Sequence, residues 1–380
     1  MPKLKILFIT EYYPYEENIR GLFIKEHAKA ASLYNEVIVI NGLEVEKPTK
    51  KLYKINDTIN GGIREIHICY YAPRPFPKIF YPVYLWALLK IVKKLLNEGF
   101  MFDVIHAHEY FFAFPAILLS RYFRIPLVIT EHFSYFPLGA MKGLKLLKAR
   151  LVMNRANVIL PVSYALQKAI EGCGIRGNFE IIPNTVDTRL FYTSRKKDED
   201  KQMKKILFVG LLKPTKGIFC LIEALAKVNE MRHDFKLDIV GDGPCRAIHE
   251  RQAKDLGLED KVIFHGLKTK KEVSQFMMEA DFFVLPSEWE NLPCVLIEAM
   301  ASGLPVIATK VGGIPEMVTE KAGKLVSPKN SNALAEAINY MLDHYIDYSS
   351  EEIAMYAEER YSYKTVGKAL DRVYRDLSKE

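Results

Sequence analysis

The sequence is poor in cysteine and has no long hydrophobic run. Its five cysteines, spread over 380 residues, form no CxxC pair. We therefore expect neither a disulfide framework nor a cysteine zinc cluster, and a reducing, cytoplasmic setting. The longest apolar stretch, 79–89, contains Pro82 and is about half as long as a membrane-spanning helix must be. The short apolar run near the N-terminus is typical of a buried strand, not of a secretory signal.

The composition is that of a folded globular protein, with 49% hydrophobic and 26% charged residues, and the length suits two domains. The net charge of +7 is unevenly distributed: residues 1–183 carry 24 Lys and Arg against 15 Asp and Glu, whereas residues 184–380 carry 29 against 31. The positive first half predicts a surface that meets anions. No aromatic-and-glycine platform accompanies these charges, so anionic lipid headgroups or a phosphorylated acceptor are favoured over nucleic acid.

Short apolar runs alternate with helical patterns, which predicts an α/β protein with parallel sheets covered by helices. A first domain is expected over 1–186, a polar linker over 187–205, a second domain over 206–349 and a helical tail over 350–380. The first-domain strands are expected at 5–9, 36–40, 64–70, 104–106, 127–130, 158–160 and 180–182. In the tail, Val366, Leu370, Val373 and Leu377 recur at helical spacing, so one face should pack back on the first domain.

The densest motif is residues 287–303, SEWENLPCVLIEAMASG, between an apolar strand at 282–285 and another at 305–308. Pro293 suits the first turn of a helix and Gly303 its end. The backbone amides at this helix start, those of Leu292, Cys294 and Val295, would form an anion site.

Two carboxylates flank this helix start. Glu290 precedes the helix and Glu298 lies about one and a half turns into it, so both could accept hydrogen bonds from sugar hydroxyls in one cleft. The alternative is that Glu298 pairs with a lysine and Glu290 is solvated.

This motif resembles the EX7E motif of the GT4-type retaining glycosyltransferases, with Glu290 and Glu298 at the matching positions. The resemblance implies a GT-B fold, in which two Rossmann-like domains with parallel sheets face each other across a cleft. It also implies that Glu290 orients the donor sugar and Glu298 holds the ribose. The family commonly has Gly after the first Glu; Asn291 stands here, a residue that tolerates unusual backbone angles.

Residues 209–217, VGLLKPTKG, resemble the family's GxLxxxKG loop. The resemblance implies that Lys216 neutralises the donor diphosphate, with Gly210 shaping the loop. Many members have Arg where Leu211 stands, and Lys213 could substitute for it. The alternative for Lys216 is a solvated loop lysine.

Three further loops of the second half resemble the family. Gly241 and Gly243 belong to a GDGP turn that either contacts the donor or is simply tight. Because Arg246 occupies the third glycine position of a dinucleotide motif, NAD is disfavoured. The resemblance implies that backbone groups around His265 and Leu267 hold the nucleobase, and that Glu316, in a VGGxxE-like loop, braces the donor pocket.

The first half contributes fewer motifs. Gly21 either lets the backbone approach the donor phosphate or simply starts a helix. His132 follows an apolar strand and resembles the family's sugar-contacting histidine, although a structural histidine is the alternative. His106 and His108 look like a metal pair, but such a pair needs a third ligand nearby, so packing and no metal are expected. Asn184 resembles a hinge residue that sets interdomain geometry.

Two basic amphipathic stretches, 78–97 and 141–155, could lie on an anionic membrane surface. The alternative is that each is a helix with a core-facing apolar side and a solvated basic back.

The resulting hypothesis is a retaining transfer of a hexose-type sugar from a nucleotide-diphosphate sugar to a glycan, lipid-linked or small-molecule acceptor. UDP is slightly favoured over GDP, and no cofactor or metal is expected because Lys216 and the helix start would stabilise the leaving group. We expect a cytoplasmic protein that contacts the inner membrane face peripherally. A non-catalytic nucleotide-sugar or glycan-binding subunit is the alternative, kept open by Leu211; an epimerase would need an acid–base set that the sequence lacks.

Overall fold

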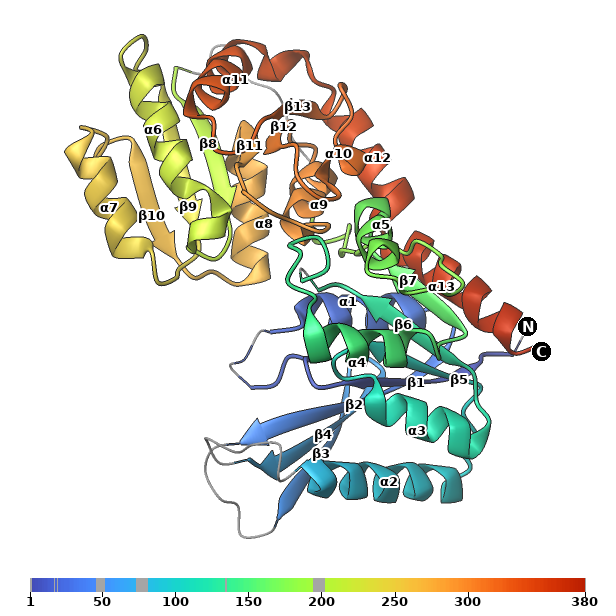
Figure 1. The fold of residues 1–380 in the computed structure, drawn as a ribbon. Coiled ribbons are helices and arrows are strands. Elements are labelled where there is room, and N and C mark those ends of the chain that lie inside the picture. The colour runs from blue at the N-terminus through green and yellow to red at the C-terminus, as the bar shows by residue number, and fades with distance from the viewer. Residues whose placement is uncertain are drawn as a thin grey trace. The chain divides into compact units, whose positions relative to one another are not determined.

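The computed structural model describes residues 2–16, 18, 20–45, 52–72, 81–133, 135–193 and 202–379. The chain forms two compact units (Figure 1). The first comprises Met1–Thr185 and Tyr363–Glu380, and the second Val186–Ser362. Each unit is a Rossmann-like sheet covered by helices, as the alternating sequence pattern predicts.

The first unit contains a seven-stranded sheet in the order β3-β4-β2-β1-β5-β6-β7. Its strands are β1 (Lys5–Thr10), β2 (Glu36–Val45), β3 (Tyr53–Asn60), β4 (Ile63–Tyr71), β5 (Val104–His108), β6 (Leu127–Glu131) and β7 (Val158–Pro161). All neighbours are parallel except β3, which pairs antiparallel with β4. Strand β3 was not predicted, because this edge strand is largely exposed and mostly polar.

The strand predicted at 180–182 is wrong. These residues donate only isolated backbone hydrogen bonds towards β7, from Glu180 N to Ile159 O at 3.1 Å and from Ile182 N to Pro161 O at 3.2 Å. The helices of the first unit are α1 (Leu22–Ser32), α2 (Tyr81–Asn97), α3 (Phe114–Phe123), α4 (Gly143–Met153), α5 (Tyr164–Gly172) and α13 (Tyr363–Leu377).

The second unit contains a six-stranded sheet in the order β10-β9-β8-β11-β12-β13, and all its pairs are parallel. Its strands are β8 (Lys204–Val209), β9 (Phe235–Val240), β10 (Val262–Gly266), β11 (Phe282–Leu285), β12 (Val306–Thr309) and β13 (Gly323–Val326). Its helices are η2 (Pro214–Lys216), α6 (Ile218–Asn229), α7 (Arg246–Asp255), α8 (Lys270–Glu279), α9 (Cys294–Ala301), α10 (Ile314–Met317), α11 (Ser331–His344), η3 (Tyr345–Asp347) and α12 (Ser350–Tyr361).

Both sheets reverse their strand order next to their first strand. In the first sheet β1 lies between β2 and β5, and in the second β8 lies between β9 and β11. At such a reversal the connections leave towards opposite faces, so a crevice opens beyond the carboxyl ends of the central strands. The loops after β1, β5, β8 and β11 are therefore the places to look for a site.

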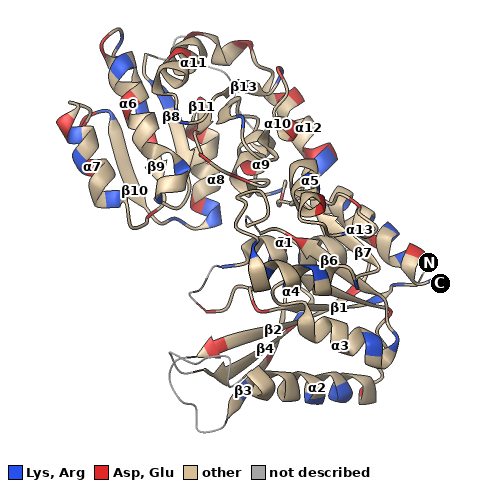
Figure 2. Ribbon diagram, in the orientation of Figure 1, with Lys and Arg blue, Asp and Glu red and all other residues tan. Residues whose placement is uncertain are grey.

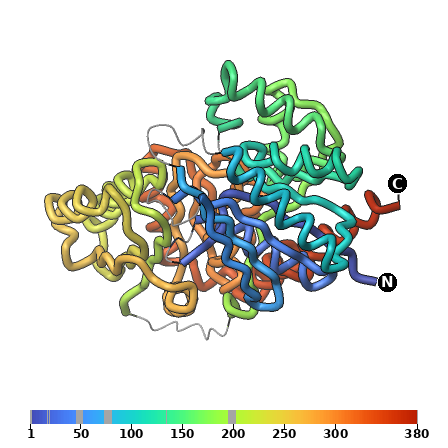
Figure 3. The backbone as a smooth tube through the Cα atoms, turned by 90° about the horizontal axis from the view of Figure 1, so that it is seen from below, coloured from blue at the N-terminus to red at the C-terminus, as the bar shows by residue number. Residues whose placement is uncertain are grey.

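The tail consists of two helices that separate at Ser362, and α13 alone belongs to the first unit. Its apolar residues Val366, Leu370, Val373 and Leu377 are buried in one core cluster with α1. Helix α12, also expected to cross back, belongs to the second unit and packs against α9, whereas the predicted packing on the first domain is confirmed for α13. This return brings the C-terminal end beside the N-terminal segment, where Arg375 donates to the carbonyl of Pro2 at 3.2 Å (Figure 3).

Gly367 sets how closely α13 approaches α1. A Cβ at this position would collide with the backbone carbonyl of Ala30. In an open helix, replacing Gly with Ala stabilises by roughly 1 kcal/mol. We expect the opposite sign here: Gly367→Ala should lower the free energy of unfolding by about 1–3 kcal/mol, because the two helices must move apart.

Urea unfolding of the variant measures this effect. Lys368→Ala, at an exposed position of the same helix, is the matched control and should change stability little. A Gly367→Ala variant more stable than the wild type would show that α1 and α13 do not pack this closely.

Candidate functional site

In the second unit, two loops at the strand-order reversal bring Lys216 to Glu290. Lys216 ends η2 in the loop after β8, and Glu290 lies in the loop after β11. The loops are joined by a hydrogen bond from Glu288 N to Thr215 O at 2.9 Å. Gly217, at φ 68°, lies so close to Pro286 O that a Cβ would collide with it. This approach places the Lys216 ammonium in an ion pair with the Glu290 carboxylate.

The Glu290 side chain is held on one oxygen. Both Lys216 and Ser287 bond to Oε1, the Ser287 hydroxyl at 2.8 Å. Among the described residues Oε2 has no hydrogen-bond donor, and it remains the carboxylate's available acceptor. Glu290 is 9% exposed, so the alternative of a solvated Glu290 is wrong.

A glycine loop supports the backbone of Glu290. A Cβ at Gly312 would collide with the Glu290 carbonyl, and Gly313 N donates to Asn291 O at 2.8 Å. Asn291 is not among the described residues with positive φ. The loop therefore does not require the unusual backbone angles for which Asn291 was expected to substitute.

Glu298 lies on α9 and is 8% exposed. Its Oε1 is 3.3 Å from Nζ of Lys270, the first residue of α8. The alternative of a lysine partner for Glu298 is thus correct, and any hydroxyl bound there shares the carboxylate with Lys270.

The start of α9 lies beside these carboxylates in the chain. Pro293 is the N-cap with extended backbone angles, not a residue of the first turn as predicted, and the helix begins at Cys294. Leu292, in the loop before the helix, is buried, whereas Cys294 and Val295, in the first turn, are half-buried. The first-turn amides and the helix dipole give this end a partial positive charge.

The GDGP turn is packed against the loop after β8. Leu212 N donates to Asp242 O at 2.9 Å. A Cβ at Gly241 would collide with Gly210 O, and one at Gly243 would crowd the Leu212 backbone. These glycines are therefore required by backbone packing, which supports the tight-turn alternative.

The nucleobase candidates lie at the end of β10. The His265 ring is held by Asp238, with Nε2 2.7 Å from Oδ1, and Leu267 is 68% exposed. Lys213 and Leu211 are also exposed, and Glu316 lies exposed on α10.

The first unit gathers three histidines at its own strand-order reversal. His108 ends β5, His132 follows β6 and His27 lies on α1. Nδ1 of His108 is 3.3 Å from Nε2 of His132, whose Nδ1 lies 3.1 Å from Oδ1 of Asn184. His27 bonds through Nε2 to the carbonyl of Pro183 at 3.1 Å. Asn184, predicted as a hinge residue, thus orients His132.

These histidines are neutral near pH 7. Burial lowers the pKa of His27 to about 4 and those of His108 and His132 well below the ordinary value. The neighbouring His106 uses both ring nitrogens, on Tyr374 Oη and Thr130 Oγ1 at 2.6 Å each. His106 is therefore a packing residue, as predicted.

The metal pair was set aside because it needs a third ligand nearby. That argument does not hold for His108, because His27 and His132 each offer a nitrogen within 4.8 Å of it and of one another. His27 was not predicted from the sequence, in which it is only one residue of the buried face of α1. It lies four residues after Phe23, and the Phe23 ring is 4.4 Å from the ring of His132.

Two buried groups shape this region further. Burial raises the pKa of Glu131 to about 7, although Tyr110 N, His132 N and Phe133 N donate to its carboxylate. This carboxylate holds the backbone at His132. Gly21, the N-cap of α1 at φ 74°, approaches Tyr12 so closely that a Cβ would collide with its carbonyl, which gives the helix-start alternative a physical reason.

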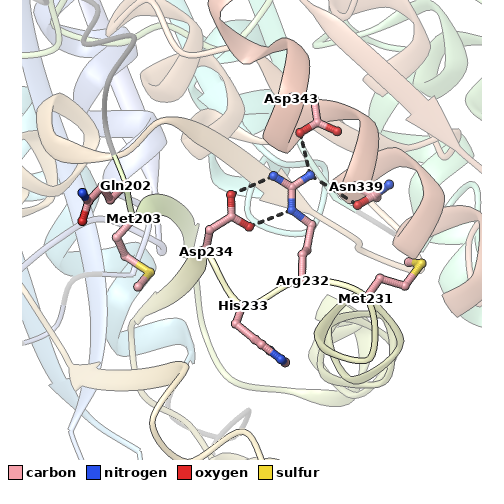
Figure 4. A pocket seen from close by; sticks show the side chains of 8 residues that line it. All are labelled: Gln202, Met203, Met231, Arg232, His233, Asp234, Asn339 and Asp343. Atoms are coloured by element: carbon pink, nitrogen blue, oxygen red, sulfur yellow. Dashed lines mark hydrogen bonds and ion pairs between the residues drawn. The ribbon is translucent and has the colours of Figure 1, made fainter.

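A separate depression of about 750 Å³ lies at the opposite edge of the second sheet (Figure 4). It surrounds Met203 and Asp234, which immediately precede β8 and β9. The Arg232 guanidinium bonds to Asp234 and Asp343, and it holds the pKa of Asp234 well below its usual range. These charges neutralise one another, so we assign the depression to stability.

Comparisons with known proteins identify the family. A family model described as Glycosyltransferase Family 4 matches residues 30–190, and one described as Glycosyl transferases group 1 matches residues 192–360. An uncharacterized glycosyltransferase of Methanocaldococcus jannaschii is 30% identical, over 98% of both chains.

Solved structures are similar over nearly the whole length. Sucrose-phosphate synthase from Thermosynechococcus elongatus has a TM-score of 0.77 at 21% identity and covers 99% of each chain. Anabaena HepE in complex with UDP and glucose has a TM-score of 0.74 at 24% identity, over 98% of this chain and 99% of that one.

Proposed function

This chain belongs to the family 4 glycosyltransferases of GT-B fold. From that premise we propose that it transfers a hexose-type sugar from a nucleotide-diphosphate sugar. The transfer would retain the anomeric configuration and need no metal ion. The observation that carries the proposal is the Lys216–Glu290 ion pair at the strand-order reversal of the second unit. The UDP bound by Anabaena HepE favours UDP as the carrier.

Lys216 would stabilise the leaving diphosphate. An ammonium group has three donors, so one can stay on Glu290 while the others reach phosphate oxygens. The first-turn amides of α9 add partial positive charge of the same kind. Fixed positive groups act where negative charge develops in the transition state, which is why no cation is needed.

The carboxylates would hold hydroxyl groups. Oε2 of Glu290 is the available acceptor for the transferred sugar, and Glu298, buried beside Lys270, would accept from the ribose. His132 is neutral and is oriented by Asn184. Its Nε2, which meets Nδ1 of His108 at 3.3 Å, would bond to a sugar hydroxyl in place of His108. A non-catalytic sugar-binding subunit is the competing function, which exposed Leu211 leaves open.

Lys216→Ala should reduce kcat/KM by about a hundredfold or more, because a lost contact to a leaving group costs on the order of 2–4 kcal/mol. Nucleotide diphosphate release from a panel of nucleotide sugars measures the rate. Lys213→Ala is the matched control, since that exposed lysine lies in the same loop, and it should lose only a few-fold.

Thermal unfolding of both variants separates chemistry from folding, because Lys216→Ala also leaves Glu290 without its cation. A loss of less than about tenfold in a folded Lys216→Ala protein, against the hundredfold expected for a leaving-group contact, would show that the diphosphate binds elsewhere. Binding of nucleotide sugar without turnover by the wild type would favour the non-catalytic subunit.

Activity should persist in excess EDTA, because Lys216 and the α9 start take the place of a cation. The assay is the same diphosphate release, before and after chelation, with added Mg²⁺ or Mn²⁺ as the control. Activity that disappears with EDTA and returns with either ion would contradict the metal-independent reaction.

The basic stretches of the first unit differ in exposure. On α4, Leu144, Leu147 and Leu151 are 84%, 52% and 49% exposed, and Lys145 of the same helix is exposed. Lys and Arg positions are blue in Figure 2. A leucine stripe at this spacing flanked by lysine is suited to an anionic membrane surface. We therefore propose a lipid-linked or membrane-proximal acceptor.

On α2 most of the apolar side is buried, as the alternative expects, although Trp86 and Leu89 are 50% and 41% exposed. Tyr84, Leu88, Ile91 and Leu95 face the core, while Lys90, Lys93 and Lys94 lie outside. Residues 78–80 of this predicted stretch lie outside the described residues. In the part of the chain that the structure describes, no helix has the length and apolar character needed to cross a membrane.

Wild-type protein should sediment with anionic vesicles at low salt and less at high salt, because each lysine near such a surface contributes about 1 kcal/mol of screened attraction. A variant carrying Lys142→Glu, Lys145→Glu and Leu147→Ser should stay in the supernatant. Lys364→Glu with Lys368→Glu, exposed on α13, is the charge-matched control. Wild-type protein that stays in the supernatant at low salt would make a soluble acceptor the better proposal.

A further inference from the structure

Three histidines from three elements of the first unit present nitrogens to one point. His27 and His108 are fully buried and His132 is half-buried. One nitrogen from each lies within 4.8 Å of the others. Zn²⁺ binds histidine nitrogen at about 2.0–2.1 Å in tetrahedral geometry, which separates two ligand nitrogens by roughly 3.3 Å. His108 Nδ1 and His132 Nε2 are 3.3 Å apart, so this pair already has the required spacing.

Hydrogen bonds to the remaining nitrogens fix which lone pairs are available. Nε2 of His27 faces the carbonyl of Pro183, which can only accept, so Nδ1 of a neutral His27 carries the lone pair. Nδ1 of His132 faces Oδ1 of Asn184, which leaves the lone pair on Nε2. Without an ion this lone pair accepts from Nδ1 of His108, so a bound ion would replace that hydrogen bond and His108 would carry its proton on Nε2. Metal-bound histidines are held in this way by a carbonyl or amide behind the ring.

The cluster also contains a buried nitrogen that lacks a hydrogen-bond partner among the described residues. This atom is Nδ1 of His27, whereas buried polar atoms are nearly always bonded. The unpartnered Nε2 of His108 is not the nitrogen that meets His132, so it gives no support to the site. His106, which stacks on His108, has both nitrogens bonded and serves as an internal contrast. Nitrogen ligands select Zn²⁺ and its transition-metal neighbours over Mg²⁺ or Ca²⁺.

We propose that His27, His108 and His132 bind one Zn²⁺ ion, with water as the fourth ligand, and that this ion inhibits glycosyl transfer by occupying Nε2 of His132. The binding stands on the first unit alone. The inhibition rests on the proposed function, in which His132 contacts the sugar. Zinc is thus an inhibitor here, which is compatible with a reaction that needs no metal.

Calorimetric titration of the chelator-treated full chain with Zn²⁺ tests the binding. We expect one ion per chain, and Co²⁺ should give the visible absorption of a four-coordinate nitrogen site. His27→Gln and His108→Gln should each weaken binding at least tenfold. His233→Gln, at an exposed histidine of the second unit, is the matched control and should leave binding unchanged.

Asn184→Ala tests the site without removing a metal ligand, because it removes the hydrogen bond between Asn184 and His132. Loss of an outer hydrogen bond typically costs 10–100-fold in metal affinity, and we expect a weakening in that range. Circular dichroism and thermal unfolding establish that each variant is folded. Absence of one-to-one binding, or an equal loss in His233→Gln, would overturn the site.

The transferase assay separates the two proposals. Zn²⁺ should inhibit wild-type diphosphate release at concentrations that fill the site, and EDTA should restore it. In His27→Gln the inhibition should need at least tenfold more Zn²⁺. If zinc binds at the cluster and activity is undiminished, the inhibitory role is wrong. If the chain is inactive with every nucleotide sugar, the transferase proposal is wrong, but the zinc-binding result remains valid.

Discussion

The reversal of strand order next to β1 and β8 is the constraint on which both candidate sites depend. Parallel strands end at the same edge of a sheet, and connections that leave towards opposite faces keep that edge uncovered at the reversal. His108 ends β5 beside β1, and Lys216 and Glu290 follow β8 and β11. Each unit therefore gathers polar groups at its own reversal, next to central strands that are buried under helices.

Close backbone packing then fixes the second-unit site. Gly217 against Pro286, Gly312 against Glu290 and Gly241 against Gly210 each leave no room for a side chain. Loops held by such contacts need not reorganise when a charge develops nearby, which is the condition under which fixed ammonium and amide groups stabilise a leaving group most. Several glycines that look like ligand contacts in the sequence act in this indirect way.

The sequence predicts what local pattern encodes. Apolar runs locate nearly all the buried parallel strands, and the spacing of Val366 to Leu377 predicts the packed face of α13. It misses β3, whose polar residues lie on an exposed edge, and the short helix α5, of which only Leu166 and Ile170 are buried. It also misses Lys270 beside Glu298 and His27 beside His132, because those neighbours come from distant segments and only the fold brings them together.

The Lys216–Glu290 pair is hard to explain by stability. Its side chains are only 16% and 11% exposed, and burying two charges costs several kcal/mol each, which their attraction offsets only in good geometry. Replacing both partners with apolar residues is often neutral or stabilising, whereas removing one leaves a buried charge unpaired. A pair of this kind is best understood through what its charges can do. Two donors of Lys216 and one oxygen of Glu290 remain for a ligand, and an apolar replacement would supply neither.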